Sequence, residues 1–324
     1  MDNGIASSAE DPQGRGAARS RATAANQTLK PLVPALKPLV PGMRWLLFIA
    51  AVLVFLAGFQ LFVFTGQTAT HFAWTIVNPL AAAFLGAAYW AAFAIEALAG
   101  RQALWANARI AVPAVLVFTV LTLITTLLHL AKFHLGAKFE AATQFVTWAW
   151  IAIYALVPLL MLIVLIRQAR ASGTDPPRSA PLPRWLYILL GVQAIVLVGF
   201  GVALFIAPGL TAPLWPWKLT TLTAQATGSW LIALGVAAAQ ALVERDVRRL
   251  LPASAGYVLL GILELIALAR YPHHFRWGST PGLIYLIFLG TILIAGAAGL
   301  SRGLRGSSRP AVGRQRPPLP AQTP

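Results

Sequence analysis

Glu264 is the residue whose type and place most directly indicate chemistry, because it lies near the middle of an apolar run from Ala253 to Tyr271. An ionisable side chain is costly inside a membrane and is by default a functional-site hypothesis there. At about 100° per residue, Tyr257 and Tyr271 fall on the same helical face as Glu264. This carboxyl group could carry a proton or bind a cation. The alternative is a protonated side chain that joins two helices by a hydrogen bond.

Two other apolar runs carry polar residues at helical spacing. Threonines recur at spacings of three and four between Arg109 and Ala131, and again between Lys218 and Leu242. Such stripes could line a water-filled cavity that opens to the outer side of the membrane. The alternative is that each hydroxyl bonds a carbonyl of the preceding turn. The candidate polar residues are Thr119, Thr122, Thr126, Thr223, Gln225 and Thr227.

The five histidines are candidate ligands for a metal ion or haem, because neutral imidazole commonly binds zinc, copper and haem iron. Their spacing matches no established ligand motif, so histidines placed in polar loops at the membrane surface are the alternative. The chain has no cysteine, which excludes disulfides and thiolate metal sites. The candidate ligands are His129, His134, His273 and His274.

The composition shows which elements must position these residues. Of the 324 residues, 58% are hydrophobic and only 10% are charged, whereas soluble domains carry about 25% charged residues. Apolar runs of roughly 20 residues, enough to cross a hydrocarbon core about 30 Å thick, recur along the chain. Only helices or closed barrels satisfy their backbone in lipid, and these runs are too long for barrel strands. We therefore expect an all-α integral membrane protein with about eight transmembrane helices, at Trp45–Thr65, Thr75–Ala99, Arg109–Ala131, Thr143–Ile166, Arg184–Ala207, Lys218–Leu242, Ala253–Tyr271 and Pro281–Leu300.

The formal charge of +16 would suggest nucleic acid on a soluble chain. Here the positions of the basic residues indicate membrane orientation, since cytoplasmic loops carry an excess of Lys and Arg. With both termini cytoplasmic, 20 of the 25 basic residues lie on the inner side and can meet anionic lipid. The sequence thus predicts a multi-pass protein of the plasma or inner membrane and no nucleic-acid partner. The five exceptions are Lys132, Lys138, Lys218, Arg270 and Arg276.

An internal repeat is indicated by matches at a spacing of 140 residues. Because each half has an even number of spans, the repeat would be parallel, in a four-plus-four arrangement. At this spacing the counterpart of Glu264 is Ile124. The matching residues are Arg44-Trp45-Leu46 with Arg184-Trp185-Leu186, Trp90 with Trp230, Arg109 with Arg249, and His134 with His274. The expected regions are a disordered tail at 1–43, the two repeats at 44–166 and 184–300, a linker at 167–183 and a disordered tail at 301–324.

Other polar and aromatic residues have simpler interpretations. Glu96 is expected near the cytoplasmic end of its helix, within reach of water. The segment from Glu244 to Arg249 is typical of a salt-bridged turn. Tryptophans near the outer side are expected to form an interfacial aromatic belt. The members of that belt are Trp74, Trp148, Trp150, Trp215, Trp217 and Trp277.

No phosphate-binding loop, His-Glu-x-x-His or Gly-x-Ser-x-Gly motif is present. The sequence therefore indicates no enzyme activity and specifies neither a cofactor nor an oligomeric state. The first functional hypothesis is a small-solute transporter with an outward-facing polar cavity, in which Glu264 carries a proton or cation. A membrane redox, metal or haem protein that uses the outer histidines is one alternative. A non-catalytic membrane scaffold is the other.

Overall fold

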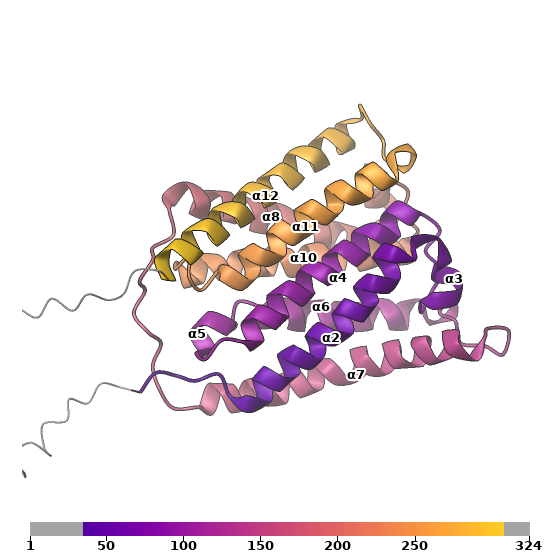
Figure 1. The fold of residues 1–324 in the computed structure, drawn as a ribbon. Coiled ribbons are helices and arrows are strands. Elements are labelled where there is room, and N and C mark those ends of the chain that lie inside the picture. Colours follow the sequence, from indigo (N-terminus) through magenta and orange to yellow (C-terminus); the bar gives the residue numbers. More distant parts are fainter. Residues whose placement is uncertain (1–34, 308–324) are drawn as a thin grey trace, which may run out of the picture. The chain divides into compact units, whose positions relative to one another are not determined.

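The computed structural model describes residues 35–307, and this part of the chain is helical without any β-strand. Seven of its helices are long and apolar enough to cross a membrane, which is the architecture of a multi-pass protein in contact with the lipid bilayer (Figure 1). These are α2 (Pro41–Val63), α4 (Pro79–Gly100), α7 (Ala141–Arg170), α8 (Arg184–Ile206), α10 (Thr221–Glu244), α11 (Leu251–Arg270) and α12 (Thr280–Ser307).

The remaining expected span contains a shorter helix, α6 (Val112–Leu128). Its 17 residues extend over about 25 Å at 1.5 Å per residue, less than a typical hydrocarbon core. All eight expected runs thus contain a helix, whereas eight membrane crossings stay a prediction. Short helical pieces connect the long ones: η1 (Thr65–Gln67), α3 (Thr68–His71), α5 (Trp105–Ala108), η2 (Leu130–Lys132), α9 (Pro208–Thr211), η3 (Ala212–Leu214) and η4 (Pro272–His274).

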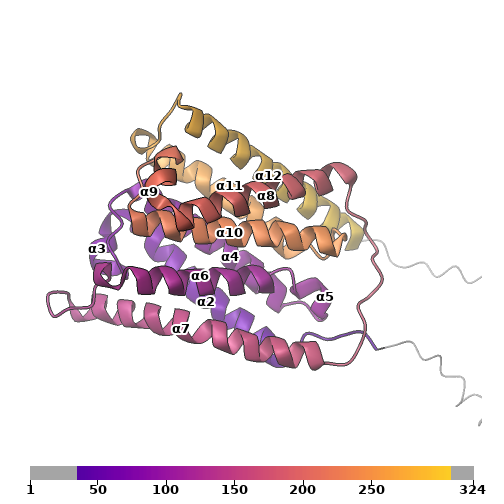
Figure 2. The ribbon, with the colours of Figure 1, turned by 180° about the vertical axis from the view of Figure 1, so that it is seen from behind.

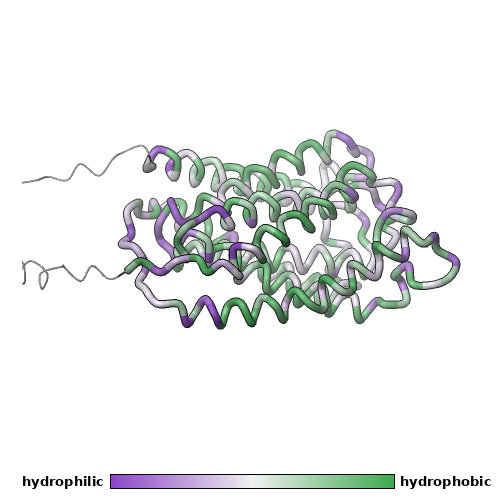
Figure 3. Tube along the Cα trace, turned by 60° about the horizontal axis from the view of Figure 1, so that its bottom comes forward, coloured by the Kyte–Doolittle hydropathy of each residue, from purple (hydrophilic) through white to green (hydrophobic). Residues whose placement is uncertain are grey.

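The eight helices alternate in direction, so the connections gather at two ends of the bundle (Figures 1 and 2). We call one the arginine end, which holds Arg109, Arg178 and Arg249, and the other the histidine end, which holds all five histidines. Hydrophilic residues concentrate at these ends, whereas the middle of the bundle is predominantly hydrophobic (Figure 3). Many large apolar side chains on the outside of α2, α7, α8 and α12 are exposed, as expected for surfaces that face lipid.

The two halves of the chain interleave instead of forming separate bundles. Within each half the first two helices pack closely, α2 with α4 and α8 with α10. Across the halves, α4 packs against α11, and α10 packs against α6. The last helices, α7 and α12, pack on α6 and α11 at opposite sides of the bundle (Figure 1). Each of these packing contacts in one half therefore has a counterpart in the other.

Backbone hydrogen bonds between the connecting segments also correspond between the two halves of the chain. In each half, the segment before the first helix pairs with the segment after the second, and the segment before the second helix pairs with the one after the third. The bonds are Leu39 N to Ala103 O and Leu182 N to Arg245 O at the arginine end, and His134 N to Ala73 O and Arg276 N to Pro216 O at the histidine end.

These bonds relate the halves by 142 or 143 residues instead of 140. The difference changes the partners expected from sequence matching. His134 corresponds to Arg276 instead of His274. The agreement of packing and hydrogen bonds supports an internal repeat, and the duplication itself stays a prediction.

Glycines allow the closest helix contacts, and they too occur in corresponding positions. A Cβ atom on Gly86 of α4 would lie 2.6 Å from the backbone nitrogen of Phe62 in α2. A Cβ atom on Gly228 of α10 would lie 2.7 Å from the carbonyl oxygen of Gly201 in α8. Backbones that approach this closely leave no room for a side chain, which is the usual basis of small-residue packing in membrane helices.

Several expected boundaries and environments differ from the structure. Residues 41–43 belong to α2 and residues 301–307 to α12, instead of to the expected tails, whose other parts, 1–34 and 308–324, lie outside the described residues. Four tryptophans of the expected outer belt are buried because they pack against one another and against other rings. These are Trp74, Trp150, Trp215 and Trp217. Trp148 and Trp277 are exposed, as expected for the belt.

The salt-bridged turn expected at Glu244 is the centre of a larger cluster at the arginine end. Glu244 is completely buried. Arg109 donates to both of its carboxylate oxygens, at 2.5 and 2.8 Å, and Arg249 donates to Oε2 at 3.0 Å. Gln240 Nε2 supplies a fourth bond at 2.8 Å. Asp175 of the linker also accepts from Arg109, so the linker is part of the packed structure.

The ion pairs stabilise the charged form of the Arg109 guanidinium group. The hydrogen bonds and charge of Glu244, followed by those of Asp175, raise the pKa of Arg109 above its usual value, although burial acts in the opposite direction. Arg109 therefore stays charged at any physiological pH. Loss of the Glu244 carboxylate would leave this charge without its buried partner and would therefore destabilise the fold.

Replacing Gly228 with alanine should lower the thermal stability of the purified protein, since the added Cβ overlaps the backbone of α8. Overpacking of this kind costs roughly 1–3 kcal/mol. The control is Gly199→Ala in α8, where a Cβ would meet no atom within 4 Å and the higher helix propensity of alanine should leave stability equal or improved. Equal melting temperatures for the two variants would contradict the close contact.

Replacing Glu244 with glutamine should destabilise the protein by roughly 3 kcal/mol, because two arginines lose their common buried partner. Denaturant unfolding in detergent micelles measures this loss. Glu140→Gln removes an exposed carboxylate at the histidine end and should change stability by less than about 0.5 kcal/mol. The cluster would have no structural role if both variants unfolded like the unaltered protein.

Candidate functional site

The candidate site is a pocket around Glu264 of α11. The residue is buried, with 1% of its surface exposed. Its Oε2 accepts a hydrogen bond of 2.9 Å from the Tyr285 hydroxyl of α12, and its Oε1 has no hydrogen-bond partner among the described residues. An unpaired polar atom in an apolar interior costs free energy that a ligand can restore.

The pocket has a volume of about 430 Å³ and lies between α8, α11 and α12, with contributions from α4 and α10. Aromatic rings form much of its wall. Trp215 is 5.7 Å from Tyr285 and 5.5 Å from Phe84, measured between ring centroids. Its indole Nε1 is a second buried group without a described partner. The rest of the wall is mostly aliphatic, and Glu264 is the only acidic residue among the described residues that line the pocket.

The pocket lies at the side of the bundle that faces lipid. α8 packs mainly on α10, and α12 mainly on α11, so these two helices make few contacts with each other. The lining residues Val196 of α8 and Ile284 of α12 are both exposed on the outside of the bundle. Leu214 is likewise exposed at the histidine end. The pocket therefore borders the outside of the bundle between α8 and α12.

This arrangement is suited to a cation with an apolar body. A carboxylate supplies the opposite charge, and aromatic faces attract ammonium groups through their quadrupoles. Desolvation strengthens both interactions inside a membrane. The apolar wall provides the surface that a hydrocarbon group would cover.

The two tyrosines expected on the face of Glu264 do not contact its carboxyl group. The Tyr257 hydroxyl donates to the carbonyl oxygen of Leu234, at 3.4 Å, and the Tyr271 hydroxyl forms a short hydrogen bond with Thr65. Sequence reasoning missed Tyr285, which binds Glu264 from the next helix. The only sign of this contact in the sequence was a tyrosine in the outer part of the last apolar run. Helical periodicity could not connect it with Glu264, because periodicity relates residues only within one helix.

The threonine stripe has mostly local partners. Thr119 donates to Leu116 O and Thr126 donates to Thr122 O, as the alternative interpretation expected. Thr126 also accepts a bond of 3.1 Å from Trp150 Nε1. Thr223 bonds Thr220 at the start of α10. The hydroxyls of Thr122 and Thr227 are buried without a described partner.

Gln225 links the two halves near the histidine end. Its Oε1 lies 2.5 Å from His129 Nε2, and its amide donates to the carbonyl oxygen of Phe205 at 2.9 Å. The stripe of α6 and the glutamine of α10 thus come together, as α6 and α10 pack side by side. Neither of these bonds reaches the pocket of Glu264.

A second, polar pocket of about 790 Å³ lies at the histidine end. It is lined by connecting segments, and the threonine stripe of α6 does not contribute to it. His134 is held there by Phe72 O at 2.9 Å and by the Thr75 hydroxyl at 3.0 Å. The other polar residues of its wall are Lys132, Lys138, His129, Thr220 and Thr221.

The histidines are not gathered into one ligand set. Among residues 35–307, no group of three or more His, Asp or Glu side chains could hold a metal ion. His129 and His134 are engaged with Gln225 and with Phe72 and Thr75, while His273 and His274 lie in η4, after α11. The geometry gives the metal hypothesis no additional support.

Glu96 has a different environment from the one expected. It lies one turn before the end of α4, but only 2% of its surface is exposed, so the expectation that it reaches water at the surface is wrong. Helices α2, α6 and α7 cover this part of α4 and form a pocket around it. Position along a helix could not reveal this burial, because it depends on which neighbours cover the helix end.

Comparison of the chain with protein-family models, curated proteins and solved structures finds no match.

His134 should make stability depend on pH. Burial, as the largest cause, lowers the pKa of its imidazole from 6.5, so the folded state takes up its proton less readily than the unfolded state. The stabilisation is complete above the unfolded pKa of about 6.5 and is lost as the pH falls below it. The difference in melting temperature between the unaltered protein and His134→Gln should shrink from pH 7.5 to pH 5.5. The exposed His273→Gln is the control, and a pH-independent difference for His134→Gln would contradict this account.

Proposed function

We propose that the protein is a transporter of lipophilic ammonium cations, in which the Glu264 carboxyl group exchanges a proton for the cation. The observation that carries the proposal is the unpartnered Glu264 Oε1 in a pocket walled by aromatic and aliphatic side chains. The proposal narrows the small-solute transporter expected from the sequence to one class of solute. The binding site is the pocket beside lipid instead of the outward-facing polar cavity that the sequence suggested.

The exchange is balanced in charge and atoms. With the pocket empty, Glu264 holds a proton, because an unpaired carboxylate in apolar surroundings is costly. When the ammonium enters, the proton leaves, and the carboxylate and ammonium form an ion pair. One positive charge is exchanged for another, so the net charge buried in the membrane does not change.

Tyr285 has a positioning role in this proposal. Its hydroxyl donates to Glu264 Oε2 at 2.9 Å. This bond holds the carboxyl group in place and leaves Oε1 to contact the cation. The ring of Tyr285 also forms part of the aromatic wall, 5.2 Å from Trp217 and 5.7 Å from Trp215. In the cellular orientation that we propose, the histidine end faces outward and the arginine end inward, in accordance with the distribution of basic residues.

Transport by purified protein in liposomes tests the proposal. The probe is radiolabelled hexyltrimethylammonium, whose fixed charge prevents free passage through lipid. Unaltered protein should accumulate it when the lumen is more acidic than the outside, and Glu264→Gln should reduce the initial rate at least tenfold. Tyr285→Phe keeps the carboxyl group and should retain part of the activity.

Two controls make the result specific. Glu140→Gln removes an exposed carboxylate and should transport like the unaltered protein. Hexanoate, which has the same alkyl length and the opposite charge, should not be transported. Undiminished uptake by a folded Glu264→Gln protein, with an unaltered melting temperature, would overturn the proposal.

A further inference from the structure

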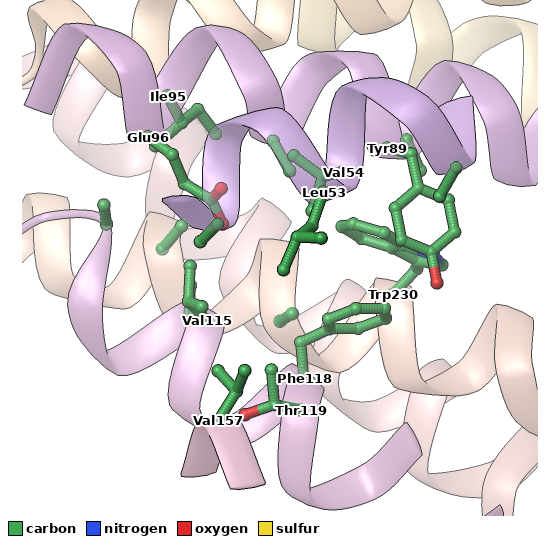
Figure 4. Close-up of a pocket in the computed structure, with 18 of the residues that line it drawn as sticks. Leu53, Val54, Tyr89, Ile95, Glu96, Val115, Phe118, Thr119, Val157 and Trp230 are labelled. Carbon is green, nitrogen blue, oxygen red and sulfur yellow. The ribbon is translucent and has the colours of Figure 1, made fainter. Parts of the chain in front are cut away.

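A second pocket lies in the first half of the chain, around Glu96 (Figure 4). Its volume is about 100 Å³, and its wall comes from α2, α4, α6, α7 and α10. Glu96 lies at one end, and Tyr89 and Trp230 lie at the other (Figure 4). Glu96 Oε2 is buried and has no hydrogen-bond partner among the described residues.

The two pockets occupy corresponding positions in the two halves. Leu53, Val54 and Ala57 of α2 line the Glu96 pocket, and the residues 143 positions later, Val196, Leu197 and Phe200 of α8, line the Glu264 pocket. The α2 and α7 walls of the Glu96 pocket thus correspond to the α8 and α12 walls of the Glu264 pocket. Each pocket therefore lies between the first and last helices of its half.

The last helices of the two halves, α7 and α12, also line the two pockets with corresponding residues. Four residues of α7 in the Glu96 pocket have counterparts 135 positions later in α12, in the Glu264 pocket. The constant spacing shows that both helices present the same face to their pockets. The pairs are Trp150 with Tyr285, Ile153 with Phe288, Tyr154 with Leu289, and Val157 with Ile292.

The chemistry of the walls is also similar, although the two glutamates come from different helices. The Glu96 pocket contains the rings of Phe118, Trp150 and Trp230. It also contains the paired hydroxyls of Tyr89 and Tyr154, which are 2.7 Å apart. A carboxyl group, aromatic faces and an aliphatic remainder are again the features that favour an ammonium group.

We infer that the Glu96 pocket is a second binding site for lipophilic ammonium cations, so that one chain binds two. This inference rests on the proposed function, because it assigns the same class of ligand to both pockets. The site is smaller than that of Glu264 and accommodates the ammonium group, while the hydrocarbon part extends between α2 and α7. Glu96 lies in the half of the bundle at the arginine end and Glu264 in the half at the histidine end.

Leu234 of α10 lines both pockets and separates them. The two pockets thus meet at one residue of α10, and the two carboxyl groups lie at different depths. A cation that moved from Glu264 to Glu96 would pass this side chain on its way toward the arginine end. The cation would thus bind a carboxylate at each of two successive sites along its path.

Equilibrium dialysis of hexyltrimethylammonium against protein in lipid nanodiscs tests the inference. The unaltered protein should bind two molecules per chain, after subtraction of binding to empty nanodiscs. Glu96→Gln and Glu264→Gln should each bind one, and the double variant none. Ala57→Phe adds a ring to the wall of the Glu96 pocket, where Ala57 is partly buried, and should also reduce the number to one.

The outcomes separate the two proposals. One molecule per unaltered chain, lost in Glu264→Gln and kept in both Glu96→Gln and Ala57→Phe, would overturn the second site and leave the proposed function standing. Two molecules per chain that persist in Glu264→Gln would instead contradict the proposed function. Hexanol, which lacks the charge, should show no difference among the variants.

Discussion

A carboxyl group inside an apolar helix bundle must find partners for its oxygens, and the three buried glutamates meet this requirement to different degrees. Glu244 has four hydrogen bonds, from two arginines and a glutamine. Glu264 has one, from Tyr285, and Glu96 Oε2 has none among the described residues. Because an unpaired buried carboxylate is costly, Glu244 is suited to a structural role, whereas the other two glutamates are suited to bind a proton or a cation.

The paired cluster positions the unpaired groups. Arg109 lies just before α6 and Arg249 just before α11, so their common bond to Glu244 at the end of α10 fixes where both helices begin. Glu264 lies on α11, which begins shortly after Arg249, so its depth is set from the arginine end. Close glycine contacts hold α8 against α10 and α2 against α4. Each pocket is lined by the first and last helices of its half.

The sequence was sufficient for the helical class and for the positions of the helices, because long apolar runs can satisfy their backbone in lipid only as helices. It also singled out Glu264, since an ionisable residue inside such a run is conspicuous. It could not reveal Tyr285 or the burial of Glu96, which depend on contacts between helices far apart in the chain. It also assigned Trp215 and Trp217 to an interfacial belt, since composition does not distinguish a ring in lipid from a ring in a wall. The 140-residue matches predict a repeat, which stays a prediction, and the paired backbone bonds correspond at 142 and 143 residues instead of 140.

The central claim is that lipophilic ammonium cations bind in the gaps beside the buried glutamates, and photoaffinity mapping tests it most directly. The probe is a trimethylammonium compound with a diazirine on its alkyl chain, irradiated with the protein in nanodiscs and followed by mass spectrometry of the peptides. We expect adducts on α8 and α12 near Val196 and Ile284, and on α2 and α7 near Leu53 and Val157, all suppressed by excess hexyltrimethylammonium. Adducts confined to the polar pocket of Lys132 and Lys138, or spread evenly over the lipid-facing helices without competition, would contradict it.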